Sequence, residues 1–418
     1  MLYVDDNHFD RRHFRDRSAL FDAHPILGRG GDVRIAVRTT DTAFWLALCL
    51  HVKEQGGTVF PLPGDTPLDA ARRRAERSGC DYLLFGTTGE EALDRATPLQ
   101  PSRSARAGAL IQMSSGTTGD AKYVERSWSS IDAEIDGYIA HFPAAGATPV
   151  VACPVTHSYG LISGVLVALR RGVEPIVVSN QNPKYILRKL RELEAPLLYS
   201  SPTLIATLTL LTPEAQPLFA VMTSGAAPQR SWFDGARRKI RHLHQQYGCS
   251  EVGCIALGLD VSAPHRVGVP LPHLQVTAGA SAAAPREIVV RQPDGSEVET
   301  RDLGYFEDSA LHFVSRLDDM INVSGANVYP AEVEEVVLEL PEISDAVAYK
   351  RPHPFGSDLV CLDFVSAVPL PERRVREWCG QKLAPHQIPM RIRQVESIPR
   401  LPNGKVSRRA LADAASNG

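Results

Sequence analysis

The chain has 418 residues, which is enough for two or three domains and a large buried core. Hydrophobic residues make up 44% of it and charged residues 22%, the balance of an ordinary globular enzyme. The formal net charge of −3 argues against general nucleic-acid binding and against a polybasic membrane patch. No window approaches the roughly eighteen apolar residues of a membrane span, so none is expected.

The cysteines indicate a reducing compartment. Seven of them are scattered through apolar segments without a C-x-x-C pair: Cys49, Cys80, Cys153, Cys249, Cys254, Cys361 and Cys379. This odd, dispersed set favours buried thiols over a disulfide framework or a zinc site. The N-terminal stretch M-L-Y-V-D-D-N-H-F-D-R-R is too charged for a signal peptide, so we expect a cytoplasmic protein.

Short strands and helices alternate along the first part of the chain. We expect strands over residues 33–37, 58–61, 82–85 and 109–113, helices over 43–53 and 67–78, and a loop over 96–108. This alternation predicts a parallel sheet.

The strand over 109–113 leads into I-Q-M-S-S-G-T-T-G-D-A-K, residues 111–122. Hydroxyl side chains surround two glycines there, and a lysine follows: Ser114, Ser115, Thr117, Thr118, Gly116, Gly119 and Lys122. Small residues let backbone N–H groups approach a ligand, hydroxyls add donors, and a cation suits a polyphosphate. Such a cluster on its own is most often a polar surface turn, and the Walker pattern G-x-x-x-x-G-K-[ST] is absent.

The alternation then continues. Apolar residues recur at helical spacing and predict a helix that packs on the core: Trp128, Ile131, Ile135, Tyr138 and Ile139. Further strands are expected over 149–153, 175–178, 197–200 and 219–223, and helices over 161–170, 183–193, 202–211 and 229–240. Beyond Glu332 the pattern indicates a small α+β unit, with strands over 345–350 and 359–365 and a helix over 371–383.

Further motifs follow in order. They are P-V-T-H-S-Y-G-L (154–161), S-G-A-A-P (224–228), Y-G-C-S-E (247–251), T-R-D-L-G-Y (300–305), the long stretch 311–335 around S-R-L-D-D-M-I-N-V-S-G, and I-P-R-L-P-N-G-K-V-S-R-R-A-L (398–411). With the phosphate-loop stretch they resemble, over about residues 33–411, the acyl-adenylate-forming superfamily: acyl-CoA synthetases, acyl or aryl carrier-protein ligases, peptide-synthetase adenylation domains and beetle luciferases. The resemblance implies an α/β fold with a large N-terminal domain (1–316) of mixed and parallel sheets layered with helices. A small mobile α+β C-terminal domain (317–418) would follow a hinge near Asp318.

The resemblance also implies site residues. Catalytic roles would fall to Lys405, Glu251, Lys122 and Thr118, with Glu251 holding Mg²⁺. Nucleotide would be bound by Ser114, Ser115, Gly116, Thr117, Thr118, Gly119, Lys122, Ser224, Gly225, Ala226, Tyr247, Gly248, Ser250, Asp302 and Arg316. Asp302 would grip the ribose hydroxyls with its two acceptor oxygens, and an aromatic face such as that of Tyr247 can stack on adenine.

The acid pocket would be lined by His157, Tyr159, Gly160, Gly225, Gly248 and Cys249, and the thiol channel by Ser324 and Gly325. Cys249 is expected as pocket wall and not as nucleophile, because no general base is implied beside it. The sequence departs from the family pattern at Ala121, Tyr123, Arg301 and Ala326–Asn327, and fewer residues precede the phosphate loop than in a typical relative.

The activity implied is attack of a small carboxylate on MgATP to give an acyl-adenylate and pyrophosphate, followed by transfer to a thiol with release of AMP. The acceptor would be coenzyme A or the 4'-phosphopantetheine arm of a discrete carrier protein, and the enzyme a monomer or homodimer. Two alternatives stay open, which are transfer to a non-thiol acceptor and a degenerate nucleotide-binding protein. Retention of Lys122, Glu251, Asp302, Arg316 and Lys405 argues against the second.

The segment 157–161 carries no carboxylate that could hold an α-ammonium group. An unpaired buried ammonium would cost several kcal/mol. We therefore expect an acid without an α-amino group, either an aryl acid or a fatty or other aliphatic acid. His157 and Tyr159 slightly favour a flat aromatic body.

Overall fold

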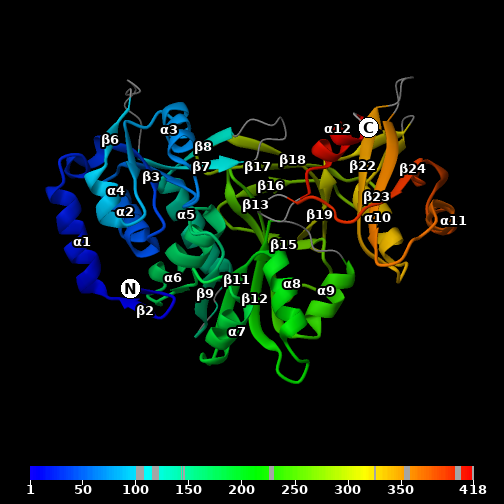
Figure 1. Cartoon of the computed structure of the whole chain (residues 1–418), viewed down its shortest axis with the longest axis horizontal. Coiled ribbons are helices and arrows are strands. Elements are labelled where there is room, and N and C mark those ends of the chain that lie inside the picture. The colour runs from blue at the N-terminus through cyan, green and yellow to red at the C-terminus, as the bar shows by residue number, and fades with distance from the viewer. Residues whose placement is uncertain are drawn as a thin grey trace.

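The computed structural model describes residues 1–99, 108–114, 122–142, 144, 146–225, 230–323, 326–352, 358–400 and 406–416 (Figure 1). Its α-helices are α1 (Arg11–Ala23), α2 (Thr42–Glu54), α3 (Leu68–Arg77), α4 (Gly89–Asp94), α5 (Trp128–His141), α6 (Val167–Arg170), α7 (Pro183–Arg191), α8 (Pro202–Leu211), α9 (Arg230–Arg237), α10 (Pro330–Leu338), α11 (Glu372–Lys382) and α12 (Arg408–Ser416). Two 3₁₀ turns, η1 (Leu27–Asp32) and η3 (Pro385–Gln387), and a π-helix, η2 (Tyr159–Leu166), accompany them. The predicted α/β class is confirmed. No helix of the described ranges is long and apolar enough to cross a membrane.

A six-stranded sheet forms from the first third of the chain. Its order is β6 (Thr97–Pro98), β5 (Tyr82–Phe85), β3 (Arg34–Arg38), β4 (Thr58–Leu62), β7 (Ala109–Ser114) and β8 (Lys122–Ser127). The middle four strands are parallel, as the alternation predicts. β8 was not expected. It returns antiparallel to β7, with Ser114 opposite Lys122, so the two strands bring the residues that flank the phosphate loop together.

The largest sheet runs through the middle of the molecule. Its order is β16 (Gln275–Thr277), β17 (Arg286–Arg291), β18 (Glu297–Glu307), β19 (Ala310–Arg316), β15 (Arg266–Pro270), β14 (Gly253–Gly258), β13 (Ile240–Cys249), β12 (Leu218–Ser224), β11 (Pro196–Ser200), β9 (Thr148–Ala152), β10 (Ile176–Val177), β1 (Leu2–Val4) and β2 (Asn7–Phe9). The strands from β1 to β13 in this order are parallel, and β14 to β19 pair antiparallel. Ligands bind at the carboxyl ends of parallel strands, which here are the ends of β9, β11, β12 and β13.

Helices cover both faces of the parallel strands. Alternate strand residues enter two hydrophobic cores, so that Tyr199 and Met222 pack on the α5 and η2 side while Leu198 and Val221 pack against α7, α8 and α9. Because both faces are buried, β9, β11 and β12 are largely apolar, whereas β13 also buries the polar residues His244, Gln245 and Gln246. The expected core contacts of α5 are confirmed, since Trp128, Ile131, Ile135 and Tyr138 are all buried.

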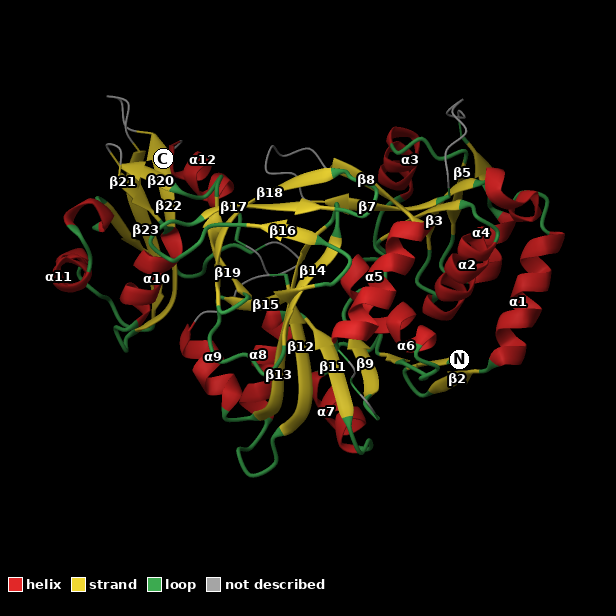
Figure 2. Ribbon diagram, turned by 180° about the vertical axis from the view of Figure 1, so that it is seen from behind, coloured by secondary structure: helices red, strands yellow, loops and turns green. Residues whose placement is uncertain are grey.

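The C-terminal region forms a separate layer at the end opposite α1 (Figures 1 and 2). Its sheet has the order β22 (Ile343–Pro352), β23 (Asp358–Ser366), β24 (Arg391–Gln394), and a hairpin of β20 (Ile321–Val323) and β21 (Ala326–Val328) precedes it. α10 and α11 pack on this sheet around a hydrophobic core of its own. The boundary after Arg316 and the hinge at Asp318 stay predictions.

Candidate active site

The β7–β8 hairpin meets the turn between β13 and β14. Lys122 Nζ donates to Glu251 Oε1 at 3.0 Å, and the side chains are 64% and 30% exposed. Burial alone would raise the pKa of Glu251, but the hydrogen bond from Lys122, a backbone hydrogen bond and the charge of Lys122 together lower it. Glu251 is therefore an ionised and accessible carboxylate at neutral pH, which is what a magnesium ligand has to be.

Several predicted site residues lie outside the described residues or at their limit. Ser115, Gly116, Thr117, Thr118, Gly119, Ala226, Ser324, Gly325 and Lys405 lie outside, and Ser114 is the last residue of β7. The chain on either side of Lys405 is anchored. Arg400 forms a bridge with Val406 and an ion pair with Asp345 at 2.7 Å. Arg408 then pairs with Glu334 at 2.7 Å.

Three residues predicted to bind nucleotide lie together. Tyr247 Oη donates to Asp302 Oδ2 at 2.8 Å, and Arg316 Nε lies 3.7 Å from Asp302 Oδ1. Asp302 on β18 is directly opposite Arg316 on β19, so the antiparallel register sets this contact. The arrangement places an aromatic ring, a carboxylate and a guanidinium at one corner, a set of groups that suits a nucleoside with its phosphate.

The unexpected arginine at position 301 contacts the predicted hinge. Its backbone has φ 62°, a left-handed conformation that glycine adopts freely and other residues rarely do. Its Nη2 donates to Asp318 Oδ1 at 2.9 Å, and Arg316 Nη2 lies 3.9 Å from Asp318 Oδ2. Two guanidinium groups thus face the carboxylate of Asp318.

The motif around His157 forms a loop that runs into the π-helix η2, and π-helical turns are rare and concentrate at functional sites. Tyr159 Oη donates to the Met222 carbonyl at 2.5 Å and lies 3.5 Å from the Ser200 carbonyl, at the carboxyl ends of β12 and β11. Its ring is 5.9 Å from that of Tyr199. The hydroxyl of Tyr159 is therefore occupied by the backbone, and the ring acts as a wall.

The predicted acid pocket is electrically neutral. The His157 side chain is exposed at its surface, but the protein atoms around the imidazole partly desolvate it and lower its pKa. Burial raises the pKa of the partly accessible Cys249 to about 12. Neither group is charged at neutral pH, so Cys249 is an unreactive thiol. In the segments that meet here, residues 153–161, 199–201, 222–225 and 245–253, Glu251 is the single acidic residue.

Gln246 is a residue that the sequence did not single out. It lies on the face of the sheet that carries Tyr199 and Met222, directly opposite Ser224, and is 6% exposed. Its Oε1 is buried without a hydrogen-bond partner among the described residues. A buried acceptor of this kind normally has a donor. Gln246 could not be predicted as a site residue, because the pattern of residues 242–249 does not indicate a strand.

The turn that carries Glu251 is tightly packed. Gly248 has no room for a side chain, since a Cβ there would lie 2.0 Å from the Gly253 carbonyl oxygen, and Ser250 lies in the turn itself.

The remaining predicted site residues lie on two other elements. Ser224 is the last residue of β12 and Gly225 comes directly after it, while Gly160 is buried in η2.

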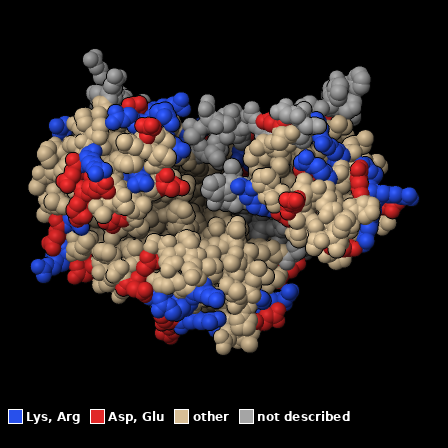
Figure 3. Space-filling model, viewed as in Figure 1, with Lys and Arg blue, Asp and Glu red and all other residues tan. Residues whose placement is uncertain are grey.

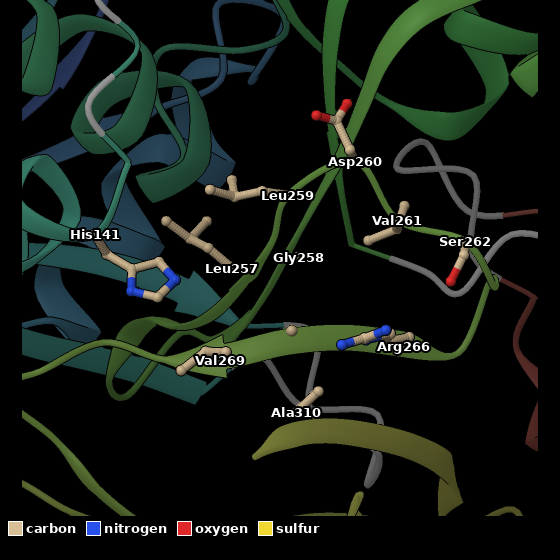
Figure 4. A pocket seen from close by; sticks show the side chains of 11 residues that line it. His141, Leu257, Gly258, Leu259, Asp260, Val261, Ser262, Arg266, Val269 and Ala310 are labelled. Atoms are coloured by element: carbon tan, nitrogen blue, oxygen red, sulfur yellow. The ribbon is translucent and has the colours of Figure 1, made fainter. Parts of the chain in front are cut away.

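The surface is hollowed at the middle of the face in Figure 3, between the β3–β5 side and the β22–β24 side. A separate cavity of about 250 Å³ is lined mainly by the end of β14, the loop after it and β15, and Figure 4 shows Leu257, Asp260 and Arg266 around it. None of the predicted site residues lines that cavity.

Comparison with known proteins identifies the family. Residues 24–278 match the model of the AMP-binding enzyme family, and residues 332–405 match the model of its C-terminal domain. The chain is 34% identical over 414 residues to a 3,4-dihydroxybenzoate–[aryl-carrier protein] ligase of Bacillus anthracis, covering 98% of both chains. It is 23% identical to a 2-succinylbenzoate–CoA ligase of Bacillus licheniformis, over 72% of this chain and 69% of the relative.

Solved structures share the fold. ATP-bound MatB from Rhodopseudomonas palustris superposes with a TM-score of 0.85 at 19% identity, covering 100% of this chain and 96% of that one. MenE from Bacillus subtilis, in complex with ATP and magnesium ion, gives 0.81 at 18% identity and covers 98% and 96%. The family-model match and the 34% identical relative define an adenylate-forming enzyme. The chain belongs to the AMP-binding enzyme family and is an AMP-forming acid–thiol ligase.

Proposed function

We propose that this enzyme activates a hydroxylated aromatic acid with MgATP and passes the aryl group to the phosphopantetheine thiol of a discrete aryl carrier protein. The observation that carries the proposal is the neutral pocket, in which aromatic and uncharged groups adjoin a charged nucleotide corner. The full-length similarity to an aryl-carrier-protein ligase supports it.

The residues at the nucleotide corner fit ATP and Mg²⁺. The ionised Glu251 offers an oxygen ligand, and the described residues contain no cluster of three or more His, Cys, Asp or Glu side chains that could hold a metal alone. Magnesium is commonly bound by one or two carboxylates together with substrate phosphates. When bound, it would neutralise phosphate charge, while Lys122 and Lys405 would stabilise the charge that develops as pyrophosphate leaves.

The acid would lie along the Tyr159 ring, with its carboxylate toward the nucleotide. Among the described residues of the pocket segments an ammonium group would find no free acidic partner, because Glu251 is the single acidic residue there and pairs with Lys122. The side-chain amide of Gln246 offers an acceptor for a phenolic hydroxyl. A site built to hydrogen-bond a hydroxyl discriminates strongly against analogues that lack it.

The second half-reaction needs the thiol to reach the adenylate. We place the passage at Ser324–Gly325 and the domain movement at Asp318, whose carboxylate is held by Arg301. In this step the thiol loses its proton to water, its sulfur attacks the acyl carbon, and AMP leaves with the electrons of the broken bond between the acyl carbon and the phosphate oxygen. Movement of a domain between two half-reactions is an ordinary gating step.

The acceptor can be tested directly. The enzyme is given ATP, Mg²⁺ and 3,4-dihydroxybenzoate with either coenzyme A or an aryl carrier protein in its phosphopantetheine-bearing form, and thioesters are measured by mass spectrometry. We expect kcat/KM for the carrier to exceed that for coenzyme A, and no product with the carrier that lacks phosphopantetheine. A preference for coenzyme A would overturn the carrier assignment, and failure to form any adenylate would overturn the proposal as a whole.

A further inference from the structure

A fully buried ion pair is formed by Arg126, which lies on the same strand as Lys122. Arg126 Nη1 donates to Glu134 Oε2 at 2.7 Å, and the two side chains are 2% and 1% exposed. Arg126 lies on β8, on the same face as Lys122, whereas Glu134 projects from α5. A buried ion pair is weak evidence for stability, because desolvation offsets its attraction. The Arg126–Glu134 pair is therefore a candidate for a role other than stabilising the fold.

The other oxygen of Glu134 holds the start of β14. Its Oε1 accepts from the Cys254 backbone N–H at 2.8 Å. Gly253 has φ +89°, and a Cβ there would lie 2.3 Å from both Arg126 Nη1 and Glu134 Oε2. The turn that carries Glu251, two residues earlier, therefore packs directly on the ion pair.

β8 thus contacts this turn at two points. Lys122 at one end of the strand reaches Glu251, and Arg126 at the other end reaches Gly253 through close packing and Cys254 through Glu134. Helix α5 contacts both β8 and β14 (Figure 2). A rigid connection of this kind fixes the distance between the phosphate-loop hairpin and the Glu251 carboxylate.

We propose that Arg126 and Glu134 are positioning residues that hold Glu251 in place for magnesium. The inference rests on the proposed role of Glu251 as the magnesium ligand. Loss of a group that supports a metal ligand typically weakens metal binding by roughly 10–100-fold. The pair would act by fixing the backbone of the turn and would touch neither nucleotide nor acid.

The experiment measures binding and not turnover. Calorimetry gives the dissociation constant of α,β-methylene-ATP with and without Mg²⁺, and the ratio of the two is the magnesium-dependent gain in affinity. The test variant is the double substitution Arg126→Met/Glu134→Leu, which removes both charges at similar volume, a replacement that is often neutral for stability. The matched control is Glu125→Gln on the same strand, because Glu125 points to the opposite face and pairs with Arg34 at 2.8 Å.

We expect the magnesium-dependent gain of the double variant to be at least about tenfold smaller than that of the wild type. This is the lower end of the loss in metal affinity that follows when a group supporting a metal ligand is removed. Binding of the magnesium-free analogue should stay close to wild type, and the Glu125→Gln control should keep its gain. If the double variant does not fold, Glu134→Gln replaces it, with a smaller loss of gain expected. A gain that survives in the folded variant overturns the inference.

The Glu251→Gln variant separates the two claims. If it loses the gain while the double variant keeps it, Glu251 is the magnesium ligand and the positioning role is wrong. If Glu251→Gln itself keeps the gain, the proposed role of Glu251 is wrong and the inference falls with it. An unfolding temperature lowered in the double variant without any change in the gain would assign the pair a purely structural role and would also overturn the inference.

Discussion

The two sides of the cleft differ in charge. On the nucleotide side, ionised groups face one another in the pairs Lys122–Glu251 and Arg316–Asp302. On the acid side, His157 and Cys249 are neutral because burial lowers the pKa of the first and raises that of the second. Charge is thus concentrated where polyphosphate and magnesium would bind, and it is excluded where the body of the acid would lie.

The largest expected effect concerns the charged side. Lys405→Ala should slow adenylate formation by roughly 10²–10³-fold, because one preorganised charge stabilises a transition state by about 3–4 kcal/mol. Single-turnover measurement of adenylation should show this loss, while thioester formation from synthetic acyl-adenylate should be largely retained. Lys382→Ala on α11 serves as a surface control. Equal loss of both half-reactions would contradict a role specific to adenylation.

A smaller effect is expected at the nucleotide corner. Asp302→Ala should raise the apparent KM for ATP by roughly 10- to 100-fold, because hydrogen bonds to a charged group contribute about 1.5–3 kcal/mol. It should also abolish the preference for ATP over 2′-deoxy-ATP, measured by pyrophosphate exchange. Tyr247→Phe, which removes the hydroxyl that donates to Asp302, should keep that preference. Unchanged selectivity in Asp302→Ala, together with a lower unfolding temperature, would indicate a structural role.

The smallest effect is expected on the neutral side. A thiol with a pKa of about 12 stays protonated through the physiological range, so Cys249 should resist iodoacetamide at neutral pH and react increasingly only as the pH rises toward 12. Cys249→Ser should accordingly keep nearly full turnover. Peptide mass spectrometry after alkylation at several pH values checks this, and rapid modification at pH 7 would show that the pocket is not neutral.

Parts of this contrast were predictable from sequence. The alternation of strands and helices predicted the parallel sheets. The motif resemblance predicted Lys122, Glu251, Asp302 and Arg316 as site residues, and in the structure they form the pairs Lys122–Glu251 and Arg316–Asp302. The sequence of residues 240–249 does not predict a strand, because its buried positions include the polar residues His244, Gln245 and Gln246, which leave neither an apolar run nor an alternating pattern. For the same reason the burial of Gln246 could not be predicted.

Other features depend on three-dimensional contacts. Arg126 and Glu134 are eight residues apart on a strand and a helix, so no periodic pattern links them. The left-handed backbone at position 301 could not be predicted either, because the residue there is arginine and not the glycine that usually marks such a conformation. Helix α1 was missed because its many charged residues hide the apolar positions that pack on α2.

The central claim is that the uncharged side of the cleft selects an aromatic acid without an α-amino group. A pyrophosphate-release screen over hydroxybenzoates, cinnamates, fatty acids and α-amino acids tests it most directly, with kcat/KM measured for each. The account predicts the highest value for a hydroxylated benzoate and no measurable release with α-amino acids. An α-amino acid that proved the best substrate by a wide margin would contradict the account.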